Sequence, residues 1–511
     1  MNQLFRCKTL SQLHDEMRGE NRLRRVLGPL SLTSLGIGCI IGAGIFVVVG
    51  LVAAEKAGPA MIVSFLIAGA ACIFAALCYA EFASLAPVAG SAYTYAYATL
   101  GELFAWIIGW DLVLEYTVAS ASVAHGWSKY AQNFLEIFDI HVPALLASAP
   151  YDFDPKLGQL VGTGSYFDLP ALLVVAALTV ILVIGIRESA RFNNIMVMIK
   201  VAVVLMVIVI GSVYVDPRNW HPFAPYGWAG LTLFGKTVWG AVAPGGAPVG
   251  VLAGAAIIFF AYIGFDSVST HAEEARNPHR DVPLAILASL VICTVLYIAV
   301  AAVITGMVPY DQLDIDAPVA QAFQARGLQG AQFAVSLGAV AGITSVLLVL
   351  MLSQPRVMLA MARDGLLPES VFGAVHPRFR TPWKSTIITG AAVATMAALI
   401  PLRILAELVN IGTLLAFVIV CVAVLVMRRT NPDVERPFRC PWVPVIPILG
   451  TLFCLMLMFS LPTENWLRLG VWLVIGLLIY VLYGRRNSRL AREASVACPT
   501  QASTDASADT I

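Results

Sequence analysis

Residues 36–46, Gly-Ile-Gly-Cys-Ile-Ile-Gly-Ala-Gly-Ile-Phe, form a glycine-rich interruption in an otherwise apolar segment. A second interruption, Phe-Phe-Ala-Tyr-Ile-Gly-Phe-Asp, occupies residues 259–266. Glycine weakens a helix, and the N–H and C=O groups that unwinding frees are tolerated in a membrane only where they face protein, a cavity or a ligand. Two such breaks in corresponding halves of a chain are typical of the binding site of a secondary transporter. The pair predicts a carrier for a small zwitterion.

The composition is that of an integral membrane protein. Hydrophobic residues make up 59% of the 511 residues and charged residues 12%, compared with about 45–50% and about 25% in soluble domains. A helix needs about 20 apolar residues to cross a hydrocarbon core about 30 Å thick. Twelve apolar runs have about this length or more: 29–54, 59–86, 101–131, 168–187, 193–215, 249–270, 282–306, 331–361, 383–401, 404–427, 441–461 and 466–484. We therefore expect an all-α integral membrane fold with twelve transmembrane helices.

The distribution of lysine and arginine predicts the orientation of these spans. With the N-terminus inside, 22 of the 32 basic residues flank the inner ends of spans, 8 lie outside and the other two lie within spans. Both termini are therefore expected in the cytoplasm, in a multi-pass protein of the plasma membrane, the inner membrane of a bacterium. The polar residues 1–27 contain no short apolar core with a cleavage site, so we expect no cleaved signal peptide. No basic patch interleaved with aromatic residues indicates a nucleic-acid partner.

The chain is expected to form one membrane domain, residues 28–485, between a cytoplasmic segment 1–27 and a disordered cytoplasmic tail 486–511. A polar, proline-rich linker, Asp216–Pro225, separates spans five and six. It predicts two five-helix halves in opposite orientation, about 28–215 and 230–428, each headed by a glycine-broken span. Helices 11 and 12, about 441–484, lie outside these halves.

The nine cysteines argue against cofactors and covalent partners. None lies in a predicted outer loop, and the chain has no CxxC pair. A disulfide framework and a structural zinc site are therefore not expected. We expect no metal, no cofactor and no obligatory protein partner.

A helix break exposes N–H groups at one new end and C=O groups at the other. The N–H groups near Ala43 and Gly44 favour a carboxylate, because the N-terminus of a helix has a partial positive charge. Carbonyl groups favour an ammonium. The predicted amino-group contacts are the carbonyls of Ile40, Phe260, Ala261 and Ile263. The alternative is that these glycines only permit close helix packing.

Several motifs together resemble one known family. They are Gly36–Phe46, Pro87–Tyr93, Gly109–Tyr116, Phe259–Asp266, Glu273–Pro278, Pro355-Arg356 and Ala362–Pro368. From about residue 20 to 485 the chain resembles the amino acid–polyamine–organocation (APC) transporters, in their cationic amino acid transporter-like branch. The resemblance implies a LeuT-like fold of two inverted five-helix repeats, with discontinuous helices 1 and 6 and two peripheral helices. It also implies the backbone contacts given above, although Ala43 replaces a hydroxyl residue that some relatives have.

Lys200 lies within span five, seven residues after Asn193, so about 10 Å into the hydrocarbon at about 1.5 Å per residue. Ionisable residues at such depth are functional candidates. In similar transporters a lysine at this position points at the break in span one and replaces a bound sodium ion. Lys200 is therefore our candidate for proton coupling or gating. The alternative is a lysine that extends back to the cytoplasmic interface.

Three acidic residues accompany the breaks. Asp111 and Glu115 share one face of span three because they are four residues apart, and Asp266 follows the break in span six. Glu115 and Asp266 are candidates for proton coupling, gating or recognition of a cationic side chain, or else form structural contacts. Thr344 and Ser345 of span eight could bind sodium, but hydroxyls in such helices usually bond their own backbone.

The chain is therefore expected to be a permease that moves L-amino acids across the lipid bilayer by alternating access, as a proton symporter. An amino acid exchanger or uniporter is the alternative, ahead of a sodium-coupled carrier or a sensor that does not transport. A channel would need a symmetric pore, and an enzyme would need a nucleophile or metal motif that is absent here. The sequence does not choose between neutral and cationic substrates.

Overall fold

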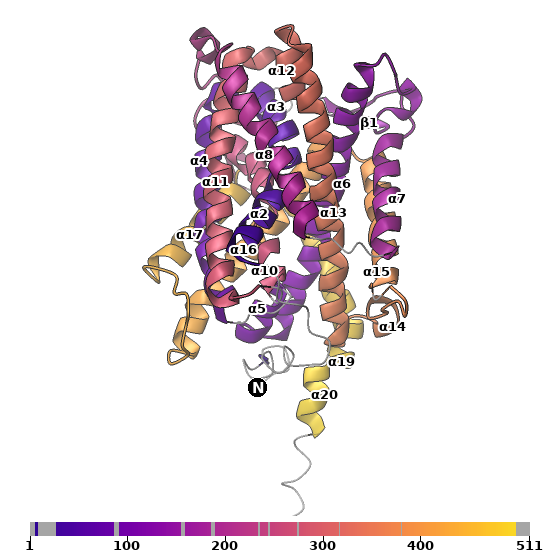
Figure 1. Ribbon diagram of the computed structural model, residues 1–511. Coiled ribbons are helices and arrows are strands. Elements are labelled where there is room, and N and C mark those ends of the chain that lie inside the picture. The colour runs from indigo at the N-terminus through magenta and orange to yellow at the C-terminus, as the bar shows by residue number, and fades with distance from the viewer. Residues whose placement is uncertain are drawn as a thin grey trace, which may run out of the picture.

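The computed structural model describes residues 6–8, 27–85, 91–154, 159–184, 190–233, 236–243, 246–272, 275–315, 317–379 and 381–496. Long helices run side by side along one axis of the molecule (Figure 1). Helices α5, α14 and α20 lie at the lower end in this view, and α12 and strand β1 lie at the upper end. The predicted motifs at residues 86–90 and 273–274, most of segment 1–27 and residues 497–511 lie outside the described residues.

Helices account for most of the chain. In the first half they are α2 (Pro29–Ile40), α3 (Val49–Val52), α4 (Met61–Leu85), α5 (Ser91–Thr99), α6 (Glu102–Glu136), α7 (Leu169–Ile184) and α8 (Ala190–Ser212). In the second half they are α9 (Val251–Ile258), α10 (Ser267–Thr270), α11 (Pro278–Met307), α12 (Pro318–Ala325), α13 (Gln329–Arg363), α14 (Glu369–Phe372), α15 (Trp383–Leu399), α16 (Leu402–Thr430), α17 (Val445–Met458), α18 (Thr463–Ile479), α19 (Arg485–Asn487) and α20 (Arg489–Val496).

A helix, continuous or broken, occupies each of the twelve predicted segments. Among the described residues, eight helical stretches are long and apolar enough to cross a membrane, and three more apolar helices are shorter. The chain is thus an all-helical, multi-pass membrane protein. One of the eight stretches, Gly44–Leu85, joins two predicted spans, which the structure separates at Gly58 (φ +61°) and Pro59. Twelve crossings and a LeuT-like arrangement remain predictions.

Helix α6 is central to the bundle. It packs against α13, α16, α15 and α5, and most of its residues are buried. Helix α11 packs against α4 and α2, and α2 also contacts α8 and α13. The short first half of span one therefore lies among helices from both halves of the chain.

Short strands lie in two connections that the sequence predicts to face the outside. Strands β1 (Tyr151–Asp154) and β2 (Gln159–Gly162) make an antiparallel hairpin in the predicted loop 132–167. Between α8 and α9, strands β3 (Leu231–Leu233) and β4 (Lys236–Trp239) pair, as do β5 (Ala241–Val242) and β6 (Pro248–Val249).

Two boundaries differ from the sequence prediction. Helix α6 continues to Glu136, five residues beyond the predicted span, because its last turn projects past the apolar segment. The tail 486–511 was expected to be disordered, but Arg489–Val496 is helical. This segment is rich in alanine, arginine, leucine and glutamate, which favour helix. The backbone N–H of Arg489 donates to Asp364, whose carboxylate also pairs with Lys8 at 2.7 Å, so both terminal segments meet at one end of the molecule.

A buried ion pair joins α4 to the connection between α16 and α17. The carboxylate of Glu81, 1% exposed, accepts two hydrogen bonds of 2.8 Å from Arg428 and one of 2.8 Å from the N–H of Cys440. The Arg436 guanidinium lies 3.2 Å away. Glu81 is 347 residues away from Arg428 in the sequence. Local periodicity therefore could not predict that these groups meet.

Replacing Glu81 with glutamine should destabilise the folded protein by about 3–5 kcal/mol, because the buried Arg436 would lose its counter-charge. The measurement is the free energy of unfolding of the purified protein in detergent. Glu369→Gln is the matched control, since Glu369 and Arg489 form an ion pair of 3.0 Å in which both side chains are more than half exposed. That exposed pair should contribute less than about 1 kcal/mol, and equal losses in the two variants would contradict the assignment.

Candidate functional site: two broken helices

The first helix break lies where the sequence predicts it. Helix α2 ends at Ile40, and Ile41 has an extended backbone with φ −72° and ψ 102°. Helical structure resumes at Ala43, which is followed by a π-turn over Gly44–Val48. The N-terminal N–H groups of the second half thus lie next to the C-terminal carbonyls of the first half.

The second break, in span six, is also confirmed. Helix α9 ends at Ile258 and continues as a 3₁₀ turn over Phe259–Tyr262. Ile263 is extended, with φ −58° and ψ 136°. Gly264 has φ +110°, a conformation that glycine adopts far more readily than other residues. Helix α10 begins at Ser267.

The two breaks lie in direct contact. A Cβ atom on Gly44 would lie 2.3 Å from the Cα atom of Ala261, and one on Gly264 would lie 3.0 Å from the carbonyl oxygen of Cys39. Glycine therefore serves close packing here, as the alternative interpretation of the sequence supposed, and it also permits the unwinding. All six predicted substrate contacts are buried around this crossing: Ile40, Ala43, Gly44, Phe260, Ala261 and Ile263.

The side chain of Lys200 extends from α8 to the first break. Its ammonium is fully buried and donates to the carbonyl oxygens of Gly38 at 2.7 Å and Ile41 at 3.2 Å. Its methylene groups pack against Gly342 of α13, where an added Cβ atom would lie 3.1 Å from Cγ of the lysine. The lysine does not reach back to the interface. Its positive charge lies at the C-terminal end of α2, where cations are favoured.

Tyr297 of α11 links the two breaks, and the sequence analysis did not identify it. Its hydroxyl lies 2.7 Å from the carbonyl oxygen of Ile40 and 3.0 Å from that of Ala261. The ring packs against Phe65 and Tyr262, with centroids 5.5 Å and 5.6 Å away. One hydroxyl proton is shared by two carbonyls, each of which has two lone pairs. Both carbonyls, predicted to hold an amino group, retain the capacity to accept a further bond.

Two more side chains bond the backbone near the breaks. The hydroxyl of Tyr130, on α6, donates to the carbonyl of Phe46 at 2.6 Å. The amide of Asn410, on α16, donates to Ala256 at 2.8 Å and Ile257 at 3.2 Å. In the sequence, these residues stand out only as polar groups within long apolar runs.

The acidic candidates lie beside the second break. Glu115, on α6, is 1% exposed and interacts electrostatically with Asp266 and Asp111. The hydroxyl of Tyr116 donates to Asp266 at 3.1 Å. Neither oxygen of Asp111 has a hydrogen-bond partner among the described residues. A Cβ on Gly412 of α16 would lie 2.7 Å from Asp111 Oδ1. The structure thus buries all three carboxyl groups in one region, with Asp266 bonded to the neighbour of Glu115, and places Asp111 against α16.

Of the two hydroxyls of span eight, that of Thr344 bonds its own backbone, as expected for such helices. Thr344 donates to Val340 at 2.7 Å and accepts from the indole of Trp127 at 2.8 Å. The hydroxyl of Ser345 is buried with no hydrogen-bond partner among the described residues. In the described part of the chain, no group of three or more histidine, cysteine or acidic residues is placed to hold a metal ion.

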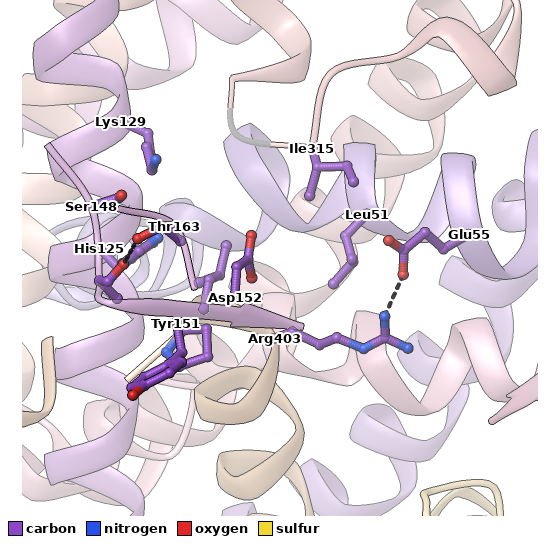
Figure 2. Close-up of a pocket in the computed structure, with 13 residues that line it drawn as sticks. Leu51, Glu55, His125, Lys129, Ser148, Tyr151, Asp152, Thr163, Ile315 and Arg403 are labelled. Atoms are coloured by element: carbon purple, nitrogen blue, oxygen red, sulfur yellow. Dashed lines mark hydrogen bonds and ion pairs between the residues drawn. The ribbon is translucent and has the colours of Figure 1, made fainter. Parts of the chain in front are cut away.

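A small cavity of about 70 Å³ lies near the end of the second half of span one, on the side that the sequence predicts to face outward. Its lining includes Leu51, Glu55 and Arg403, and the outer hairpin contributes Tyr151 and Asp152. Figure 2 shows Arg403 reaching Glu55, with an N–O distance of 2.7 Å. This ion pair joins the end of span one to the start of α16.

Broken helices that meet inside a bundle, with their freed backbone groups turned to one another, define a membrane transporter rather than an enzyme. Comparison with known proteins supports this class, and residues 27–482 match the family described as amino acid permease. The chain belongs to the amino acid permease family of the APC superfamily.

Three relatives cover most of this chain. The branched-chain amino acid permease BcaP of Bacillus subtilis (strain 168) is 48% identical over 488 residues, which are 95% of this chain and 99% of BcaP. The methylthioribose transporter of the same strain is 46% identical over 490 residues, 96% of this chain and 100% of the relative. Cationic amino acid transporter 4, vacuolar, of Arabidopsis thaliana is 40% identical over 85% of this chain and 68% of the relative. These relatives are permeases and transporters, which supports amino acid transport as the class of function.

Replacing Gly44 with alanine should abolish amino acid binding, because the added methyl group would displace the backbone of Ala261 and separate the two breaks. The measurement is the ligand-induced rise in unfolding temperature of the purified protein. Gly470→Ala is the control, since no atom lies within 4 Å of a Cβ there and alanine favours the helix. Ligand binding by the Gly44 variant at the strength of the Gly470 variant would contradict a site at this crossing.

Proposed function

We propose that this protein is a proton-coupled symporter that moves L-amino acids across the membrane by alternating access. The observation that supports this most strongly is the contact between the two breaks, where Lys200 bonds the end of α2. The lysine nitrogen in that position can hold a proton as an ammonium, in place of a bound sodium ion, and can release it as a neutral amine. The amino acid would bind by its carboxylate at Ala43 and Gly44 and by its ammonium at the carbonyls of Ile40, Phe260, Ala261 and Ile263.

The proposed architecture is a LeuT-like fold with twelve crossings, built from repeats at about 28–215 and 230–428. Helices α17 and α18 would lie at the periphery, and both termini would lie in the cytoplasm. The meeting of both terminal segments at Asp364 supports an even number of crossings. The plasma membrane is the proposed location, and the bacterial relatives BcaP and the methylthioribose transporter support a bacterial inner membrane.

Glu115 and Asp266 are proposed to take part in coupling or in gating. Their closeness supports this, because two neighbouring buried carboxyl groups rarely ionise together. A proton on either one changes the charge beside the span-six break.

The substrate side chain is proposed to be neutral and apolar, as the name of BcaP indicates for that relative. Buried apolar side chains near the breaks support this, among them Val346, Val47 and Phe259. The methylthioribose transporter shows that a relative of similar identity has a different named substrate, so substrates must be compared directly.

Proteoliposomes under an inward proton gradient should accumulate labelled leucine or alanine against its concentration, at a clamped membrane voltage. Labelled arginine should accumulate less. Exchange without accumulation would indicate an exchanger, and equilibration alone a uniporter. Accumulation driven by sodium instead would assign Thr344 and Ser345 as ion ligands and contradict proton coupling.

Replacing Lys200 with methionine should abolish proton-driven accumulation and leave a measurable part of counterflow exchange, because exchange needs no net proton movement. Lys384→Met is the control, since Lys384 also donates to a backbone carbonyl, that of Ser370 at 2.9 Å, but from an exposed site. Full accumulation by the Lys200 variant, with an unchanged pH dependence, would remove this residue from the coupling mechanism.

A further inference from the structure

The outer cavity contains a histidine that the transport mechanism above does not use. His125 lies on α6, is 5% exposed and lines this cavity. Its Nδ1 atom lies 3.6 Å from Oδ2 of Asp168, a fully buried carboxyl group at the start of α7. Figure 2 places His125 beside Thr163 and Ser148 of the outer loop.

Asp168 is held in place independently of the histidine. Its Oδ1 atom accepts hydrogen bonds from the hydroxyl of Ser128 at 2.6 Å and from the N–H of Ala171 at 3.0 Å. The backbone N–H of Asp168 donates to Ala398 of α15 at 3.0 Å. The Oδ1 bonds form the cap of α7, an arrangement that favours a negative charge. The second oxygen, Oδ2, is the one that faces His125.

The charged groups around the imidazole are of both signs. The titratable and charged groups that line the cavity or face His125 are Glu55, Asp152 and Asp168 on the acidic side, and Lys129 and Arg403 on the basic side. These come from the end of span one, the outer hairpin, the start of α7, α6 itself and α16. The carboxylate of Asp168 lies 3.6 Å from the imidazole nitrogen, so a proton on the ring would form an ion pair with it.

We propose that His125 and Asp168 form a proton-binding site on the outer side of the membrane, and that its occupancy raises the affinity for substrate. The effect on substrate affinity rests on the proposed function, whereas the proton site itself does not. The next residue, Gly126, supplies the structural link, because a Cβ there would lie 3.4 Å from the Cβ of Ala43 and 3.0 Å from Val47. Helix α6 thus packs closely against the proposed carboxylate site one residue after His125, and this contact is the proposed route from the proton site to the substrate.

The chain offers a matched control in His141, whose Nε2 lies 3.3 Å from Asp139 with both side chains largely exposed. Solvent and salt screen such a pair. His141→Gln should therefore behave as the wild type. Asp168→Asn is a second variant, because asparagine retains the capping oxygen and removes only the charge that faces His125.

The first experiment measures thermal unfolding of the purified protein without substrate between pH 8 and pH 5.5. Ordinary imidazole titrates near about pH 6.5. A protonated pair stabilises the folded state at low pH, and this contribution is lost as the pH rises and the proton leaves. The wild type and His141→Gln should therefore gain stability on acidification relative to His125→Gln and Asp168→Asn. An identical pH dependence in all four proteins would overturn the proton site.

The second experiment measures uptake of labelled leucine by proteoliposomes at fixed internal pH and varied external pH. The KM of the wild type should fall by about fivefold or more from pH 8 to pH 5.5, the lower end of ordinary coupling between two sites. In His125→Gln it should change by less than about twofold. An unchanged response in that variant would overturn the link to substrate affinity. If no variant transports an amino acid, the proposed function fails, while the unfolding measurement still decides the proton site.

Discussion

Backbone groups released inside a membrane must find partners within the protein, and the rest of this structure depends on that constraint. Helices α2 and α9 both stop in the interior of the bundle. Side chains from four neighbouring helices then donate to carbonyls at or near the breaks: Lys200, Tyr297, Tyr130 and Asn410. Each donor comes from a different helix, so the unwound segments are fixed by the surrounding bundle. Loss of one such donor removes a buried hydrogen bond, at a cost of about 0.5–1.5 kcal/mol.

The same contacts explain why a transport site fits here. Lys200 places a positive charge at the carbonyl end of α2, where the helix end is partially negative. Tyr297 divides one proton between the two breaks, so its bonds are weaker than two full hydrogen bonds and the acceptors keep free lone pairs. Gly44 and Ala261 lie too close for any larger residue. A small zwitterion is the kind of ligand that matches freed N–H groups on one side and carbonyls on the other.

The sequence predicted those parts of the fold that depend on local composition. Long apolar runs predicted the helices, and the glycines of residues 36–46 and 259–266 located both breaks. The depth of Lys200 in span five made it a functional candidate, and its contacts with Gly38 and Ile41 agree with the position that the family resemblance implied. Tyr297 was not predicted. The pattern of an apolar run does not show whether the hydroxyl of a tyrosine within it forms a hydrogen bond or the ring only packs. The Glu81 cluster and the His125–Asp168 pair were missed because their partners lie on different helices or connections and meet only when these pack together. The helix of Arg489–Val496 was missed because a polar tail was taken as disordered although its residues favour helix.

The central claim is that the two breaks together hold an amino acid by its backbone groups. The most direct test is an experimental structure of the protein with bound leucine. The account predicts the leucine carboxylate within about 2.7–3.2 Å of the N–H groups of Ala43 and Gly44, and the ammonium at the same distance from carbonyls of the span-six break. Leucine bound elsewhere, for example in the outer cavity beside Glu55 and Arg403, with the two breaks unoccupied, would contradict it.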